Sequence, residues 1–311
     1  MGNTLKPIGG GKDDAPQIQA AMDALIDPDD RWPNEAGGEI VLSKGKYTIQ
    51  TQMTVPCGGI IIKGEGNPST IACVLEWKGG TGAMFVLRNP VSKYQRTSGF
   101  HISDVSLRSN GEGVAFAFDA FENYGREWRF TRVAANFFDK VFEVRNSKSY
   151  PGGIHCNDCR FTYNNQVLDA TARPVNETRF RDCLLSKNGM GLERYAFDIR
   201  GGSNIVFMDS VIEGQPRAIR VNNTQGVTIE GCRFESNVEN TDSGIENPRT
   251  DAVVHLENCR HIYMQRCFHR IVALEEESDN VTLMIKDCVG YDFSGSVLRR
   301  IVVDNKWKSA W

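Results

Sequence analysis

The chain contains 311 residues and has a formal net charge of -3, with no long run of either sign that would suggest a nucleic-acid-binding arm. No segment approaches the ~20 consecutive apolar residues that cross a bilayer, so we expect no membrane insertion. Nine cysteines is an odd number in a long chain, and disulfide frameworks are typical of short secreted domains, so we expect free, buried thiols.

The first element that the sequence predicts is a short helix. Asp14 is a suitable N-cap, and Pro16 falls in the first turn, where its missing N–H costs nothing. The apolar side chains that share one helical face are Ile18, Ala21, Met22 and Leu25. We expect this helix to cover the open end of a strand stack that begins with the run GGEIVL at residues 37–42.

A repeated pattern then occupies most of the chain. In each repeat, apolar residues stand at positions i, i+2, i+5 and i+7. The two alternating pairs predict two strands, and the two residues between the pairs predict a sharp corner. The third position of the pattern is filled by Val105, Val133, Cys159, Cys183, Ser210, Cys232, Cys267 and Cys288, at intervals of 21 to 35 residues. Positions that break the apolar rule are Thr178, Ser210, His269 and Gly290.

These intervals match the coil lengths of solenoid proteins, and the longest interval predicts an insertion near residues 237–250. Because a single coil cannot bury its own apolar face, the coils must stack. The sequence therefore predicts an all-β protein, a single right-handed parallel β-helix with a short N-terminal capping helix. We expect one domain over 1–311, with an N-terminal segment at 1–38, coils at 39–299 and a C-terminal end at 300–311.

The cysteines in this pattern have two interpretations. Cys156 and Cys159 form a C-x-x-C beside His155, which is one half of a zinc-binding pattern, but no second C-x-x-C completes it. Both residues fall at inward positions, so we expect them to be core residues. The residue before the third position is often aspartate, as at Asp104 and Asp158, and a structural role at the corner accounts for it.

A third short strand follows each corner, and its outward positions also align from coil to coil. The first outward column contains Asp119, Glu143, Asp169, Asp198, Arg220 and His255. The column two residues further along contains Phe121, Arg145, Thr171, Arg200, Asn222 and Glu257. Carboxylates about 4.8 Å apart on neighbouring coils repel one another, so we expect the proton affinity of at least one to rise. A different outward column contains His101, His155 and Tyr263, for which we expect exposure to solvent.

This face could carry out chemistry on a sugar polymer. Two carboxyl groups about 5 to 9.5 Å apart perform glycoside hydrolysis, and our first candidate pair is Asp169 with Asp198, with Glu143 in reserve. A lyase needs a base, for which His255 is a further candidate, and cations that neutralise a uronic carboxylate. The candidate substrate-binding residues are Arg145, Arg200, Arg220, Asp119 and Asn222.

Two other interpretations of the same face stay open. Asp198 with Arg220, and Glu143 with Arg145, could form surface ion pairs that serve structure alone. Asp119, Glu143 and Asp169 also form a candidate calcium site, because hard cations bind clustered carboxylates, although spacing identifies no further ligands. We expect no other cofactor and no transition-metal site.

The N-terminal segment resembles a known family. The run GGGKDDAPQIQAAMDAL from Gly9 to Leu25, followed by GGEIVLSKGKYTIQ and IIIKGEG, is similar to the opening of pectate-lyase-type β-helix domains. That superfamily includes polysaccharide lyases, glycoside hydrolases, epimerases and bacteriophage tailspike depolymerases. The R-x-P-x-x-R motif of calcium-dependent pectate lyases does not occur here. Of the N-T-D, D-D and G-H-G series of polygalacturonases, residues 240–242 spell N-T-D, but no D-D or G-H-G follows, so the resemblance implies the fold more than an activity.

The resemblance implies a polysaccharide lyase or glycoside hydrolase that acts on an acidic bacterial surface or extracellular polysaccharide, of the phage or prophage tailspike type. The alternatives are a non-catalytic saccharide-binding or structural tail component, and a polyuronate epimerase. Residues 1–14 lack the apolar core of a secretory signal, so we expect a virion tail or a cytoplasmic location for the chain as written. In the tailspike interpretation we expect a homotrimer, and no nucleic-acid partner.

Overall fold

The computed structural model describes residues 3–25, 37–56, 58–66, 72–87, 99–119, 127–145, 152–189, 194–215, 217–235, 253–270, 283–296, 298 and 301–304. The expected insertion at 237–250, Phe121 and the side chain of His269 lie outside this set. Within the described parts, no helix is long and apolar enough to cross a membrane.

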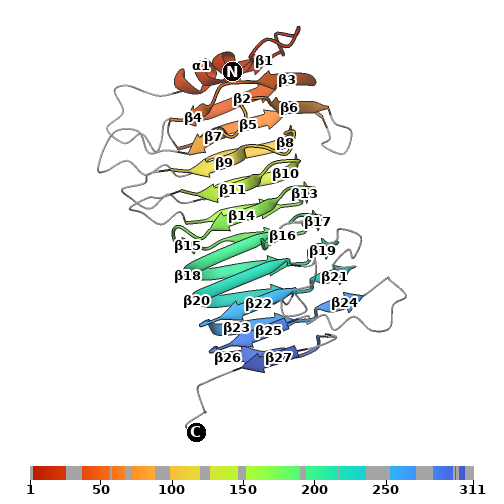
Figure 1. Cartoon of the computed structure of the whole chain (residues 1–311). Coiled ribbons are helices and arrows are strands. Elements are labelled where there is room, and N and C mark those ends of the chain that lie inside the picture. Colours follow the sequence, from red (N-terminus) through yellow and green to blue (C-terminus); the bar gives the residue numbers. More distant parts are fainter. Residues whose placement is uncertain are drawn as a thin grey trace, which may run out of the picture.

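The described strands wind into one right-handed parallel β-helix, which Figure 1 shows as a stack running from the N-terminal helix to the C-terminus. Each full coil contributes a strand to each of three faces, which we call the first, second and third sheets in the order in which the chain meets them. The predicted fold class is therefore confirmed.

The first sheet is formed by strands that pair in parallel along the stack. These are β1 (Asn3–Leu5), β2 (Gly38–Leu42), β5 (Ile60–Gly64), β8 (His101–Arg108), β10 (Trp128–Asn136), β12 (Ile154–Asn157), β16 (Arg179–Arg181), β18 (Phe197–Met208), β20 (Ile219–Glu230), β23 (Arg260–Gln265) and β26 (Val289–Asp292).

The second sheet begins beyond the sharp corner, so the long strands β8 and β10 continue into it. Its other members are β3 (Gly45–Ile49), β6 (Cys73–Trp77), β13 (Arg160–Thr162), β17 (Leu184–Ser186), β19 (Val211–Glu213), β21 (Arg233–Glu235) and β24 (Phe268–Arg270).

The third sheet, which bears the candidate site, includes the opening residues of β18 and β20. Its other members are β4 (Met53–Val55), β7 (Ala83–Leu87), β9 (Val114–Phe118), β11 (Lys140–Val144), β14 (Gln166–Ala170), β22 (Val254–Glu257), β25 (Leu283–Lys286) and β27 (Ile301–Asp304). The short strand β15 (Val175–Asn176) pairs with β18 at the bend between the third and first sheets.

Side chains of like size stack on one another in the core. The rings of Phe85, Phe116 and Phe142 follow one another at 5.3 and 5.6 Å between centroids. Cys156 and Cys159 are both fully buried, and the eight described cysteines are free thiols. The prediction that the C-x-x-C cysteines belong to the core is confirmed, because period-two strands on either side of the corner point both inward.

The corner between the first and second sheets has a consistent backbone conformation. Residues there have positive φ, at Asp104 (60°), Arg132 (50°), Asp158 (52°), Asp182 (53°) and Asp209 (49°). Aspartate tolerates the left-handed region better than most residues, which explains its recurrence. The Asp104 carboxylate also accepts two hydrogen bonds from the Arg132 guanidinium on the next coil, at 2.6 and 2.8 Å.

The helix α1 (Ala15–Asp23) lies at the N-terminal end of the stack and buries Ile18, Ala21 and Met22, as expected (Figure 1). Asp14 precedes it but does not cap it through its side chain. Its buried carboxylate instead accepts hydrogen bonds from the backbone N–H groups of Ile8 at 2.7 Å and Thr48 at 2.8 Å. Asp14 therefore fastens the capping segment to β3.

The predicted register of the last coil is wrong. We expected Cys288 to continue the column of Cys267, with Leu283 and Ile285 before it in the same repeat, but Leu283 pairs with Val254, and Ile285 pairs with Leu256. These residues belong to the third sheet. The backbone N–H of Cys267 instead donates to the hydroxyl of Ser296, so Ser296 occupies the next position at that corner. Gly290 is an exposed residue of β26 with φ 68°.

Candidate functional site

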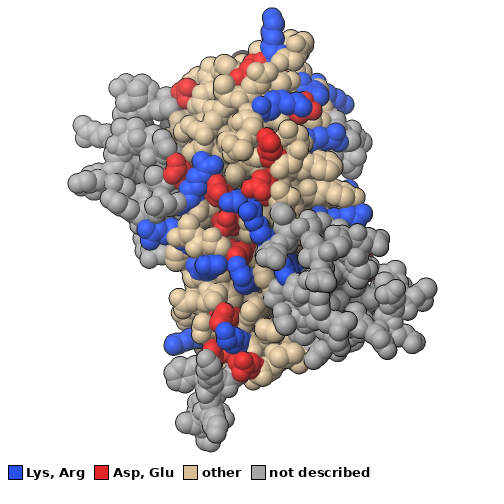
Figure 2. Space-filling model, viewed as in Figure 1, with Lys and Arg blue, Asp and Glu red and all other residues tan. Residues whose placement is uncertain are grey.

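Charged side chains form a row along the outward face of the third sheet. The register places Glu143 beside Asp169, Asp169 beside Asp198, Asp198 beside Arg220, and Arg220 beside His255. The predicted alignment of these five residues is confirmed. Figure 2 shows acidic and basic side chains alternating along this face. We call Glu143, Asp169, Asp198, Arg220, His255 and their charged partners the charged row.

Asp119 does not lie where the sequence predicted it. Glu143 pairs with Ala117 on β9, a buried residue, and not with Asp119. The backbone N–H of Arg145 donates to the carbonyl of Phe118, so Asp119 lies beside Arg145 at the end of the sheet. The acidic column therefore begins at Glu143. Arg200 pairs with Asn222 as expected, and Arg200 is exposed.

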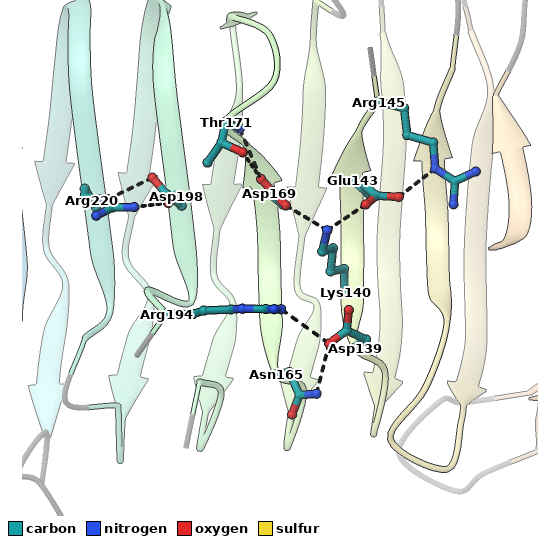
Figure 3. A network of polar contacts seen from close by, with 10 residues as sticks. All are labelled: Asp139, Lys140, Glu143, Arg145, Asn165, Asp169, Thr171, Arg194, Asp198 and Arg220. Carbon is teal, nitrogen blue, oxygen red and sulfur yellow. Dashed lines mark hydrogen bonds and ion pairs between the residues drawn. The ribbon is translucent and has the colours of Figure 1, made fainter. Parts of the chain in front are cut away.

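The Glu143 and Asp169 carboxylates share one cation (Figure 3). The Lys140 ammonium lies 2.6 Å from Glu143 Oε1 and 2.8 Å from Asp169 Oδ2. Arg145 Nε lies 2.6 Å from Glu143 Oε2, and the Thr171 hydroxyl donates to Asp169 Oδ1 at 2.7 Å. The side chains of Lys140, Glu143 and Asp169 are each less than a fifth exposed, so solvent screens these contacts only in part.

This pairing changes the expected acid–base behaviour. Burial raises the pKa of Glu143, but hydrogen bonds from Lys140 and Arg145 outweigh it and lower the pKa below its ordinary value of 4.5. Burial likewise raises the pKa of Asp169, and the hydrogen bonds from Lys140 and Thr171 bring it below 3.8. The expectation that clustering raises the proton affinity is therefore wrong for these two groups, and both are ionised at neutral pH.

Asp198 and Arg220 form a second unit of the charged row. Arg220 Nε donates to Asp198 Oδ1 at 2.9 Å and Nη2 donates to Oδ2, so the contact is bidentate (Figure 3). The guanidinium carbon lies 5.1 Å from the centre of the Tyr195 ring, and that ring lies 6.4 Å from the His255 ring. The Asp198 side chain is 8% exposed, less than those of Glu143 and Asp169, whereas the Arg220 side chain is 33% exposed.

Further units of the face are also ion-paired or hydrogen-bonded. Asn222 Nδ2 donates to Glu257 Oε2 at 3.1 Å, and the Lys286 ammonium lies 2.7 Å from Glu257 Oε1. Asp139 Oδ1 accepts from Asn165 at 3.0 Å and lies 3.6 Å from an Arg194 nitrogen (Figure 3).

The arrangement bears on the candidate calcium site. Lys140 supplies positive charge between Glu143 and Asp169, and Asp119 is separated from them in register. Among the described residues, no group of three or more histidine, cysteine, aspartate or glutamate side chains is placed to hold a metal ion. Calcium binding by Asp119, Glu143 and Asp169 stays a prediction.

The sequence did not predict the contacts of Lys140 with the two carboxylates, or the contact of Arg220 with the Tyr195 ring. In a strand, residues three apart point to opposite faces, so the spacing of Lys140 and Glu143 gives no signal of contact. The side chain of Lys140, at the start of β11, is long enough for its ammonium group to contact both Glu143 and Asp169. Tyr195 precedes β18 and lies outside the strand pattern altogether.

No family model matches the sequence, and neither does any curated protein. Solved structures do share the fold. Full-length tailspike protein 2 of a bacteriophage of Escherichia coli O157:H7 has a TM-score of 0.64 and 10% identity over 97% of this chain and 41% of its own. The ORF18 protein of Geobacillus virus E2 has a TM-score of 0.53 and 13% identity over 94% of this chain and 62% of its own.

The surface protein and adhesin PfbA of Streptococcus pneumoniae has a TM-score of 0.53 and 10% identity over 97% of this chain and 89% of its own. This chain thus spans less than two thirds of the length of either viral protein. At these identities the likeness shows a shared right-handed parallel β-helix, which confirms the resemblance at the level of the fold.

Proposed function

We propose that the protein degrades an acidic polysaccharide along the charged row, and that it does so as a lyase. The observation that carries this proposal is the Lys140 ammonium between Glu143 and Asp169, which holds both carboxylates ionised. A glycoside hydrolase needs one carboxyl group protonated at working pH to act as the general acid. Ionised carboxylates suit the base of an elimination reaction instead.

In that reaction a base removes the C5 proton beside the uronic carboxylate, the electron pair forms a C4–C5 double bond, and the C4–O bond breaks. The departing oxygen takes a proton. Asp169 is the candidate base with Glu143 beside it, and His255 is the candidate proton donor or alternative base. Arg145 and the exposed Arg200 are candidates to neutralise the uronic carboxylate, because guanidinium groups bind carboxylates in a planar fork.

Asp198 is more enclosed than Glu143 and Asp169, and it is paired with Arg220. Their bidentate contact fixes both side chains, so their role in the proposal is to shape the row and present Tyr195 and His255. Asp119 and Asn222 lie at its margins. One structural neighbour is a bacteriophage tailspike protein, which supports a phage tail protein. An assembly of three copies belongs to the same proposal.

A second candidate function is saccharide binding without catalysis. The observation in its favour is that Glu143, Asp169, Asp198 and Glu257 are all held by cations, as expected of a structural surface. The pneumococcal neighbour is a surface protein and adhesin, which is compatible with this function. A polyuronate epimerase would use the same base but return a proton to C5 without breaking the chain.

The test is incubation of the protein with a panel of acidic bacterial capsular and extracellular polysaccharides. Reducing ends and the ultraviolet absorbance of unsaturated uronates are followed together, and C5 configuration is read by proton NMR. We expect both chain-cleavage signals. Reducing ends alone would replace the lyase with a hydrolase, and inversion without cleavage would replace it with an epimerase. Binding with no reaction would leave the non-catalytic function.

A further inference from the structure

A hollow of about 440 Å³ lies away from the charged row, at the bend where β18 and β20 pass from the third sheet to the first. It spans three consecutive coils. The residues that line it include Asn204 from β18, Gln225, Gly226 and Thr228 from β20, and His261 and Tyr263 from β23. Its volume is within the range of small-ligand sites.

A glycine lies in the middle of the lining of this hollow. The register aligns Ile205, Val227 and Ile262, so the residues before them, Asn204, Gly226 and His261, are neighbours in successive coils. All three have positive φ, at 57°, 81° and 53°. Because Gly226 has no side chain, the Asn204 amide oxygen lies close over its backbone. A β-carbon on Gly226 would lie 3.0 Å from Asn204 Oδ1.

The chemistry of the lining differs from that of the charged row. Its side chains offer amide, hydroxyl, imidazole and phenol groups, and no lysine, arginine, aspartate or glutamate is among them. Amides and hydroxyls both donate and accept hydrogen bonds, as the hydroxyl groups of a sugar do. Tyr263 is 47% exposed, so part of its ring is available to pack against the C–H face of a pyranose.

We propose that this hollow is a subsite for an uncharged pyranose unit. β18 and β20 connect it directly to the charged row, since Asp198 and Asn204 are six residues apart on one strand, roughly 20 Å along the chain. A polymer that follows these strands round the bend meets cationic groups first and neutral polar groups next. Resting on the proposed function, this arrangement selects a heteropolysaccharide that contains both uronate and neutral sugars.

The test is an array of neutral oligosaccharides built from glucose, galactose, mannose, rhamnose and N-acetylhexosamines. Wild-type protein is compared with Tyr263→Ala, which removes one wall, and Thr228→Trp, which fills the hollow. Tyr163→Ala is the matched control, because Tyr163 is 50% exposed and lies at a different turn. We expect wild type and the control to bind at least one oligosaccharide, and each hollow variant to lose at least about tenfold in affinity. Thermal unfolding verifies that every variant is folded.

The inference is overturned if no neutral oligosaccharide binds to the wild type, or if folded Tyr263→Ala and Thr228→Trp bind as the wild type does. Asp169→Asn keeps the hollow intact and separates the two proposals. If the wild type binds oligosaccharides on the array but cleaves no polysaccharide, the proposed lyase function is wrong and the proposed subsite stands. If the wild type cleaves a polysaccharide but binds no oligosaccharide on the array, the proposed subsite is wrong and the lyase function stands.

Discussion

The ammonium group of Lys140 lies 2.8 Å from Asp169 Oδ2, although the two residues belong to consecutive coils. The same ammonium contacts Glu143 on its own strand. One cation thus joins β11 to β14 and offsets the repulsion between two carboxylates that the register forces together. Removing it would leave two partly buried anions next to each other.

The first prediction concerns Lys140→Met, which keeps most of the side-chain volume and removes the charge. We expect it to lower the free energy of unfolding at pH 7 by about 2 kcal/mol, the size of a charged hydrogen bond that is only partly screened. Urea unfolding measures the change. Lys46→Met is the control, because Lys46 contacts Glu76 but is 60% exposed, and we expect it to have little effect.

The effect of Lys140→Met depends on pH in a defined direction. The pKa values of Glu143 and Asp169 are lowered in the folded protein, so their contribution to stability is present above the unfolded pKa values. It is lost as the pH falls through the lowered values. The difference between wild type and Lys140→Met should therefore shrink in acid. A difference that stays constant from pH 7 to acid would contradict this account.

The second prediction concerns the bidentate contact of Arg220. Lysine cannot supply two parallel hydrogen bonds or a planar group over the Tyr195 ring. We expect Arg220→Lys to destabilise the protein by about 1–2 kcal/mol in urea unfolding, because Asp198 is buried and would lose one partner. Arg145→Lys is the comparison, since Arg145 makes one contact to Glu143, and we expect a smaller loss. Equal losses would show that the fork geometry is unimportant.

The third prediction concerns activity on an acidic polysaccharide. We expect Asp169→Asn to lower kcat at least ~100-fold, because the amide is a poor base. Asp198→Asn should also lose activity through displacement of Arg220 and its neighbours. Asp139→Asn is the matched control just before β11, since its carboxylate contacts Asn165 and Arg194, and it should keep most activity. Full activity in both Asp169→Asn and Asp198→Asn would remove the site assignment.

The sequence predicts the strand register only in part, and the reason is physical. A one-residue slip moves every side chain to the other face, so the hydrophobic pattern excludes it. A two-residue slip keeps every side chain on its face. That is how Asp119 came to be aligned with Glu143, whose partner is Ala117 two residues earlier. Apolar patterning thus predicts the sheets reliably and a single coil's register poorly.

The predicted register of the last coil is wrong for a related reason. Leu283, Ile285 and Cys288 follow the apolar spacing of the corner pattern, but so do Val254 and Leu256 in the third sheet with Cys259 after it. Asn258, just before Cys259, has φ 51°, so a second tight corner occurs between the third and first sheets. The two corners have similar geometry and therefore similar sequences. Only the way in which whole coils stack shows which corner a given segment forms.

The fourth prediction concerns the cysteines. Burial raises the pKa of Cys73 to about 12, and burial also raises the pKa of Cys159. Buried thiols with raised pKa values react slowly, because the thiolate is the nucleophile. We expect a thiol reagent such as DTNB to label no more than one cysteine per native chain, with Cys57 outside the described residues, and all nine after unfolding in guanidinium. Rapid labelling of several native thiols would contradict their place in the core.

The fifth prediction contrasts two hydroxyl groups at inward positions where other coils carry apolar side chains. Thr178 is fully buried, and its hydroxyl has no hydrogen-bond partner among the described residues. Ser210 is also buried, but its hydroxyl donates to the Met208 carbonyl at 2.8 Å and accepts from the Cys183 N–H at 3.1 Å. The same departure from the apolar pattern therefore has opposite energetic consequences.

We expect Thr178→Val to raise the free energy of unfolding by about 1 kcal/mol, because valine has the same shape without the unpaired hydroxyl. Ser210→Ala should lower it by about 1–2 kcal/mol, because the Cys183 N–H loses its acceptor inside the core. Urea unfolding of both variants measures the two signs. Destabilisation by Thr178→Val would mean that the hydroxyl has a partner after all, such as a buried water molecule held between coils.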